Sequence, residues 1–126
     1  MKRLVLGLGL VTLAALTIAC SGGGEATPSG PVASPPEGAV VIAARDLAFQ
    51  PTEVTVTAGE PVTIFFDNQE DVPHNIAIKD GTGADVFKGE IINKQSITYQ
   101  VDPLTAGTYP FICEVHPNMT GTITAS

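Results

Sequence analysis

Short segments in which hydrophobic and polar residues alternate fill the chain from Val40 onward, and they restrict its fold more than any other feature. β-Branched residues are frequent in these segments, and turn-forming residues separate them about every 8–12 positions. Many short strands with regular turns are typical of two packed sheets, so we predict an all-β protein with a Greek-key β-sandwich. Residues 84–95 are ambiguous, because they could form a short strand or a turn of helix. The expected strands cover residues 39–44, 53–57, 62–67, 75–79, 96–101, 108–113 and 121–125.

The spacing near the end of the chain predicts how several side chains are oriented. Tyr109, Phe111 and Cys113 share one face of their strand, so the thiol should point inward with two aromatic rings beneath it. A partly shielded metal site could lie at such a strand end. Leu104, Gly107 and Tyr109 also have the spacing of a tyrosine corner, in which the hydroxyl group bonds back to nearby backbone. The alternative is an ordinary half-buried tyrosine on a strand.

The first 38 residues do not share the strand pattern. Residues 1–19 open with a basic pair, continue as an apolar run and end in small residues, as secretory signal peptides do. The sequence around Cys20 resembles a bacterial lipobox, although Thr17 stands where that pattern prefers Leu. We therefore expect Cys20 to be lipidated and to anchor the protein to a membrane, in the periplasm or at the cell surface. The alternative is an ordinary signal peptide that is removed together with Cys20.

Residues 20–38 are expected to form a flexible tether between this anchor and the folded domain. They are rich in Gly, Ser and Pro and contain too few large apolar residues to bury a core. Residues 39–126 then form one domain, which we expect to be a monomer. A disulfide is not expected, because Cys20 precedes the tether and Cys113 lies within a candidate metal-binding motif.

The charge of the domain limits its partners. Residues 39–126 contain four Lys and Arg residues against eleven Asp and Glu residues. Nucleic acid is therefore not an expected partner, since binding to phosphates requires clustered positive charge. An acidic surface would steer a basic redox protein, such as a cytochrome, toward the domain. The alternative is that the charge only keeps the protein soluble.

The scarce metal-binding side chains of the domain fall into one pattern. His74 is followed after 38 residues by Cys113, and His116 and Met119 then follow at intervals of three. A thiolate, two imidazoles and a thioether are the ligand set of a blue copper site. One loop between the last two strands could present the last three, whereas His74 must come from another part of the fold. Zinc could bind the same ligands in vitro, without redox function.

Two segments carry a resemblance to a known family. Residues 72–76 (VPHNI) and 107–119 (GTYPFICEVHPNM) resemble the two copper-binding segments of the cupredoxins, also called type 1 blue copper proteins. The design is shared with plastocyanin-like chains, and the short gap between the last His and the Met is most similar to that of amicyanin-like chains. The resemblance implies a cupredoxin-like sandwich that binds one type 1 copper ion. It implies that the ligands are His74, Cys113 and His116 in a plane, with Met119 in the axial position.

The residues beside these ligands carry two further expectations. The resemblance implies that Asn75 ties the two ligand segments together by hydrogen bonds. Glu114 and Val115 depart from amicyanin-like chains, which carry a polar residue and a Pro at these places. We expect the Glu114 carboxylate to face solvent.

Two functions are compatible with such a site. The first is a tethered electron carrier outside the cytoplasm, whose copper cycles between Cu(II) and Cu(I) as it accepts an electron from one redox protein and donates it to another. The alternative is copper handling, in which the protein stores copper or delivers it to another protein. Transfer sites are often rich in Met, and Met119 is the only Met after the signal peptide, which favours the carrier.

Catalysis is not expected. A nitrite reductase or an oxidase needs further copper centres with additional histidines, and both histidines of this chain belong to the predicted site. In a carrier of this family the ring edge of His116 would be the point of electron entry. It would lie within an apolar surface patch, for which the candidate members are Val72, Pro73, Pro117 and Asn118.

Overall fold

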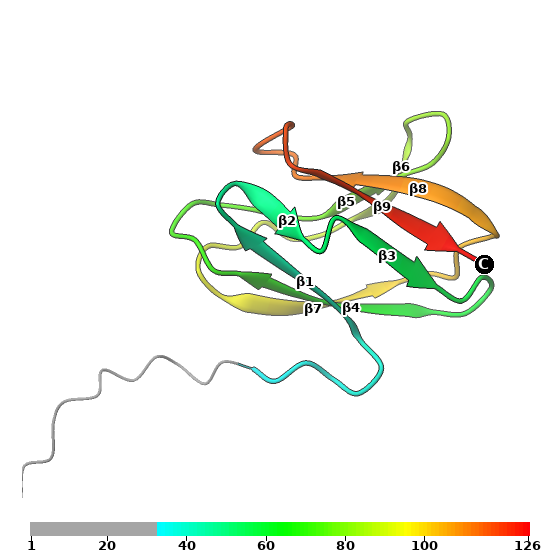
Figure 1. The fold of residues 1–126 in the computed structure, drawn as a ribbon, viewed down its shortest axis with the longest axis horizontal. Coiled ribbons are helices and arrows are strands. Elements are labelled where there is room, and N and C mark those ends of the chain that lie inside the picture. The colour runs from blue at the N-terminus through cyan, green and yellow to red at the C-terminus, as the bar shows by residue number, and fades with distance from the viewer. Residues whose placement is uncertain (1–32) are drawn as a thin grey trace, which may run out of the picture.

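A computed structural model describes residues 33–126, which form two packed β-sheets and contain no helix (Figure 1). The prediction of an all-β sandwich is confirmed. Within this part of the chain, accordingly, there is no helix that could cross a bilayer. The strands are β1 (Val40–Arg45), β2 (Ala48–Gln50), β3 (Glu53–Val56), β4 (Val62–Asn68), β5 (Ala77–Lys79), β6 (Asp85–Lys88), β7 (Ser96–Val101), β8 (Gly107–Ile112) and β9 (Thr120–Ala125).

The two sheets draw their neighbouring strands from distant parts of the chain. One sheet has the order β2-β1-β4-β7 and the other the order β3-β9-β8-β5-β6. The pairs β1–β4 and β3–β9 are parallel, and the remaining pairs are antiparallel. Because the chain changes sheets repeatedly, residues far apart in the sequence are brought side by side.

All seven expected strands are present, with ends that differ from the prediction by two residues at most. Two further strands are found. β6 settles the ambiguity of residues 84–95 in favour of a short strand. β2 forms a hairpin with the end of β1 through Asp46 and Leu47, both in the left-handed region at φ 55°.

The core is built around aromatic rings. Phe49 lies between Phe111 and Phe66, with ring centroids 5.0 and 6.3 Å from its own. Gly121 on β9 allows this packing, since a Cβ atom there would lie 2.1 Å from Cζ of Phe111. The hydroxyl of Tyr109 donates a hydrogen bond to the backbone oxygen of Thr105 at 2.9 Å. The predicted tyrosine corner is therefore confirmed.

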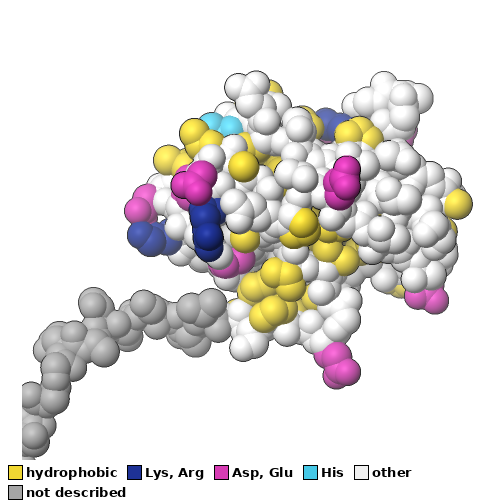
Figure 2. Space-filling view, viewed as in Figure 1, with side chains coloured by type: hydrophobic (Ala, Val, Ile, Leu, Met, Phe, Trp, Pro, Cys, Tyr) yellow, Lys and Arg dark blue, Asp and Glu magenta, His cyan; other side chains and the backbone are white. Residues whose placement is uncertain are grey.

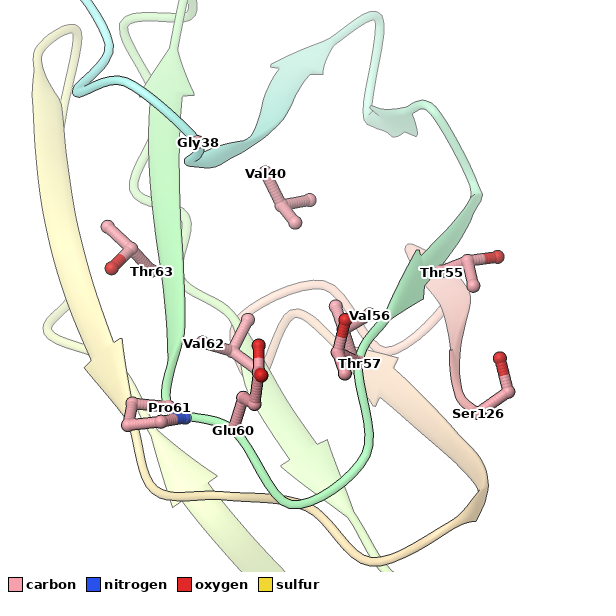
Figure 3. A pocket seen from close by; sticks show the side chains of 10 residues that line it. All are labelled: Gly38, Val40, Thr55, Val56, Thr57, Glu60, Pro61, Val62, Thr63 and Ser126. Carbon is pink, nitrogen blue, oxygen red and sulfur yellow. The ribbon is translucent and has the colours of Figure 1, made fainter.

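The two ends of the sandwich differ in character. At one end, β8 begins and β9 finishes, with Gly107 opposite Ala125. A cavity of about 360 Å³ lies at this end (Figure 3), lined by Gly38, Val40, Thr55, Val56, Thr57, Glu60, Pro61, Val62, Thr63 and Ser126. At the other end, residues 113–119 connect β8 to β9, and Arg45 at the end of β1 hydrogen bonds to Gln69. The chain thus enters the domain at the end opposite the motif-bearing loop (Figure 1).

Candidate metal centre

The connection between β8 and β9 is a tight loop that carries three of the predicted ligands. Ile112 and Thr120 face each other across its base. Inside it, the backbone N–H of Cys113 donates to the oxygen of Met119 at 3.0 Å, and the N–H of Met119 donates to the oxygen of His116 at 2.8 Å. Cys113 and Met119 are buried in the same hydrophobic cluster, whereas His116 is half-buried. The inward orientation predicted for the thiol is confirmed.

His74 reaches the same place from the connection between β4 and β5. It lies three residues before β5 begins and pairs with Ile92 through two backbone hydrogen bonds of 3.0 and 2.9 Å. The expected strand 75–79 therefore starts later, at Ala77. The pairing of β5 with β8, in which Ala77 lies opposite Ile112, brings His74 to the loop that carries Cys113. The imidazole of His74 is fully buried.

The donor atoms of His74, Cys113 and His116 converge. Sγ of Cys113 lies 3.6 Å from Nδ1 of His74 and 3.9 Å from Nδ1 of His116, and the two nitrogens are 3.1 Å apart. A point equidistant from these three atoms lies about 2.1 Å from each, and zinc, for comparison, keeps about 2.0–2.3 Å from imidazole nitrogen and thiolate sulfur. The three residues therefore fit a single metal ion. The axial role of Met119 stays a prediction.

The other ring nitrogen of His74 contacts Glu70, a residue that the sequence analysis did not identify. Nε2 lies 3.0 Å from Oε2 of Glu70. An ionised carboxylate accepts hydrogen bonds, so the proton belongs on Nε2 and the lone pair of Nδ1 faces the sulfur. The same Oε2 atom accepts a hydrogen bond from the backbone N–H of Leu47 at 3.2 Å. Burial lowers the pKa of His74, and the hydrogen bond with Glu70 opposes that change.

Asn75 joins the two motif-bearing segments directly. Its Oδ1 accepts a hydrogen bond from the backbone N–H of Glu114 at 3.0 Å. Its Nδ2 donates to Oε2 of Glu114 at 2.8 Å and to the backbone oxygen of Gly89 at 3.1 Å. The Asn75 side chain is fully buried and all of its polar atoms have partners. It therefore holds the His74 segment against the residue that follows Cys113.

Glu114 meets the expectation that it faces solvent only in part. Its side chain is only 28% exposed, because one oxygen contacts Asn75 and the other lies 2.7 Å from Nζ of Lys88. The hydrogen bonds with Lys88 and Asn75 lower the pKa of the Glu114 carboxyl. The expectation missed that Asn75 and Lys88 each hold one oxygen of this carboxylate.

A histidine and several hydrophobic side chains lie together on the surface at this end of the sandwich (Figure 2). His74 is fully buried, so the exposed histidine atoms belong to His116. Val72 and Val115 are each 39% exposed. Among the other residues expected in an apolar patch, Pro73 is half-buried, and the exposed ones are Pro117 and Asn118.

The predictions for the N-terminal segment lie largely outside the described residues. These are the signal peptide at 1–19, the lipidation of Cys20 and most of the tether at 20–38. Within the described part of the chain, Cys113 is a free thiol.

Comparisons with known proteins match this architecture. A family model described as a cupredoxin-like domain matches residues 10–125. Amicyanin from Paracoccus versutus is 38% identical over 89 residues, which cover 70% of this chain but just under two thirds, 65%, of that protein. Amicyanin-alpha from Methylorubrum extorquens is 31% identical over 123 residues, or 98% of both chains. Among solved structures, auracyanin A, a "blue" copper protein from Chloroflexus aurantiacus, has a TM-score of 0.62 and 26% identity, covering 70% of this chain and 98% of that one.

Proposed function

The chain belongs to the cupredoxin-like family, and from this we propose that it is a blue copper protein that carries single electrons between redox partners outside the cytoplasm. The observation that carries the proposal is the convergence of three donor atoms, two imidazole nitrogens and one thiol sulfur, at separations of 3.1–3.9 Å. With Met119 buried beside them, they form the ligand set expected of a type 1 copper site. The protein is a carrier and not an enzyme.

Bound copper would supply a one-electron couple between Cu(II) and Cu(I). The protein's own residues hold the ligands in one geometry that serves both states. Glu70 fixes the ring of His74 from behind, and Asn75 fixes the spacing between the two ligand segments. Because Cys113 and His74 are fully buried, water has little access to the thiolate. Such rigid support keeps the change in structure small when the electron arrives.

His116 is the point of electron entry in this proposal. It is the most exposed of the four predicted ligands, and hydrophobic side chains lie beside it on the surface (Figure 2). A partner that docks on this apolar surface would bring its redox centre close to the copper without ordering many charged side chains. The acidic domain favours a basic partner, such as a cytochrome, and the carrier acts as a monomer that does not bind nucleic acid.

The N-terminal part of the proposal concerns location. Residues 1–19 direct export, and a lipid on Cys20 anchors the protein to the membrane. Residues 20–38 then tether the domain of residues 39–126. The support for this part is the order of a basic pair, an apolar run, Cys20 and a Gly-, Ser- and Pro-rich segment.

The test is spectroscopic. The soluble protein, made with Cys20→Ala and without the signal peptide, is titrated with Cu(II) while the visible spectrum is recorded. An intense blue or green band is expected from thiolate-to-copper charge transfer, and Cys113→Ser should abolish it. As a control, Asn118→Ala changes an exposed loop residue outside the ligand set and should keep the band. A wild-type protein that lacks the band, or a band that survives Cys113→Ser, would refute the proposal.

The copper-handling alternative is less consistent with the burial of the site. Transfer sites are usually exposed, whereas His74 and Cys113 have no exposed surface. A carrier should retain its copper through repeated oxidation and reduction. A delivery protein should instead lose Cu(I) readily to a copper-free acceptor, which mixing followed by separation of the two proteins would detect.

A further inference from the structure

We propose that the ion pair between Lys88 and Glu114 is a positioning element of the copper centre, which holds the cysteine-bearing loop against β6 and balances a negative charge beside the thiolate. The inference rests on the proposed copper site. It goes beyond that site because neither residue is a ligand. Nζ of Lys88 lies 2.7 Å from Oε1 of Glu114, while Oε2 of the same carboxylate accepts the hydrogen bond from Asn75.

The ion pair reaches across three adjacent strands of one sheet, β6, β5 and β8, next to the predicted metal centre. Ala77 on β5 lies opposite Lys88 on one side and opposite Ile112 on the other. Glu114 follows Ile112 by two residues and is bonded directly to Cys113 in the chain. Lys88 therefore reaches across β5 to the residue next to the predicted thiolate. Its contact adds an attachment for the cysteine-bearing loop beyond the backbone pairing of β8 and the hydrogen bonds of Asn75.

Lys88 is also the lysine that forms an ion pair with a residue of the predicted ligand loop, Glu114. The other ion pairs formed by lysine among residues 33–126 lie elsewhere, between Lys79 and Asp85 and between Lys94 and Asp71. Two carboxylates lie near the centre: Glu70 contacts the ring of His74, and Glu114 is the residue next to Cys113 in the chain. Negative charge near copper favours Cu(II) over Cu(I) and lowers the reduction potential. Lys88 opposes this effect, so the two members of the ion pair influence the potential with opposite signs.

The experiment compares Lys88→Gln and Glu114→Gln in the copper-loaded protein. Gln at position 114 keeps an oxygen that can accept the Asn75 hydrogen bond but removes the charge. Lys88→Gln should lower the potential and Glu114→Gln should raise it, each changing the equilibrium constant for reduction by about 1.5–5-fold, because the pair is partly exposed. Lys79→Gln removes the same charge from an ion pair between β5 and β6, away from the loop, and should have a smaller effect.

Two outcomes would overturn the inference alone. The first is a blue wild-type protein in which both variants shift the potential in the same direction or not at all. The second is a double-mutant cycle on the copper-free protein, monitored by thermal unfolding, in which Lys88 and Glu114 show no coupling. The cycle measures the coupling energy of the ion pair in the absence of copper. A wild-type protein with no blue band would instead refute the proposed function, and the inference with it.

Discussion

His74 and Glu70 are joined by a contact of 3.0 Å between Nε2 and Oε2, four residues apart in a connection that is not helical. The contact determines which nitrogen of His74 carries the proton and leaves Nδ1 facing the sulfur of Cys113 at 3.6 Å. Glu70 is itself held by the N–H of Leu47 in the turn between β1 and β2. The geometry of the first predicted ligand therefore depends on a turn that precedes it by more than twenty residues.

Replacing Glu70 with Ala should weaken copper binding. Without the carboxylate, the ring of His74 loses its fixed orientation and its preferred tautomer, and such losses cost about 10–100-fold in metal affinity. Glu70→Gln should retain more of the affinity, since its amide oxygen can accept the same hydrogen bond from Nε2 of His74. Competition with a chelator measures the constants. Glu60→Ala, which removes an exposed carboxylate at the opposite end of the sandwich, is the control. Equal affinities for Glu70→Ala and the control would contradict the assigned role.

Changing Met119 should alter the potential while the blue band is retained. Cu(I) prefers fewer ligands than Cu(II), so loss of the thioether in Met119→Leu should raise the reduction potential. Leu has a similar volume and suits this buried position, which is 1% exposed. Met119→Gln supplies a harder oxygen donor and should lower the potential. Cyclic voltammetry of the three proteins checks the order, and an unchanged potential in both variants would show that Met119 is not a ligand.

The copper-free protein should lose stability as the pH falls below 6.5. Burial lowers the pKa of His74 in the folded state from its ordinary value of 6.5. Between that lowered value and 6.5, the unfolded chain binds a proton at His74 that the folded protein does not bind. The contribution of His74 to the free energy of unfolding is therefore fully present above pH 6.5 and declines as the pH falls through this window. The pKa values of Asp80 and Glu114 are lowered from 3.8 and 4.5, so these groups act only at lower pH.

Thermal unfolding from about pH 7.5 to about pH 5 measures this dependence. His116→Gln should keep most of it, because burial, the largest cause of the shift, concerns His74 alone. A midpoint that stays constant or rises toward pH 5 would contradict the prediction.

Gly121→Ala should destabilise the domain. A Cβ atom at this position would lie 2.1–2.7 Å from three carbon atoms of the Phe111 ring, in the middle of the core. The ring cannot move freely there, so a cost of about 1–3 kcal/mol is expected from overpacking. Gly81→Ala in the turn between β5 and β6 meets no atom within 4 Å and should change stability by less than about 0.5 kcal/mol. Denaturant unfolding of the copper-free proteins compares the two, and equal stabilities would contradict the expectation.

The sequence was most informative where a strand carries several buried side chains. β7 alternates, and β4 carries Val62, Ile64 and Phe66 on one face; both strands were predicted within one residue. β2 and β6 were missed or left open because they are short and each has few inward side chains, chiefly Phe49 in β2 and the half-buried Phe87 in β6. Periodicity cannot be recognised over so few positions.

The contacts of the metal centre also differ in how far the sequence predicts them. The proximity of Cys113 to His116 follows from local spacing, because both lie on one short loop. The approach of His74 depends on the pairing of β5 with β8, which no local pattern encodes, and the resemblance to a family supplied it. The contacts of Glu70 and Lys88 were not predicted, since they depend on the conformation of loops and on register across β5.

The domain has a polarity that follows from the directions of its strands. The polypeptide joins β1 beside the cavity at one end, and the donor atoms gather at the other. Any attachment upstream of Val40 therefore holds the domain at the cavity end and leaves the end with the donor atoms farthest from the point of attachment. A domain attached in this way could reorient to present its donor atoms first to one redox partner and then to another while it stays attached.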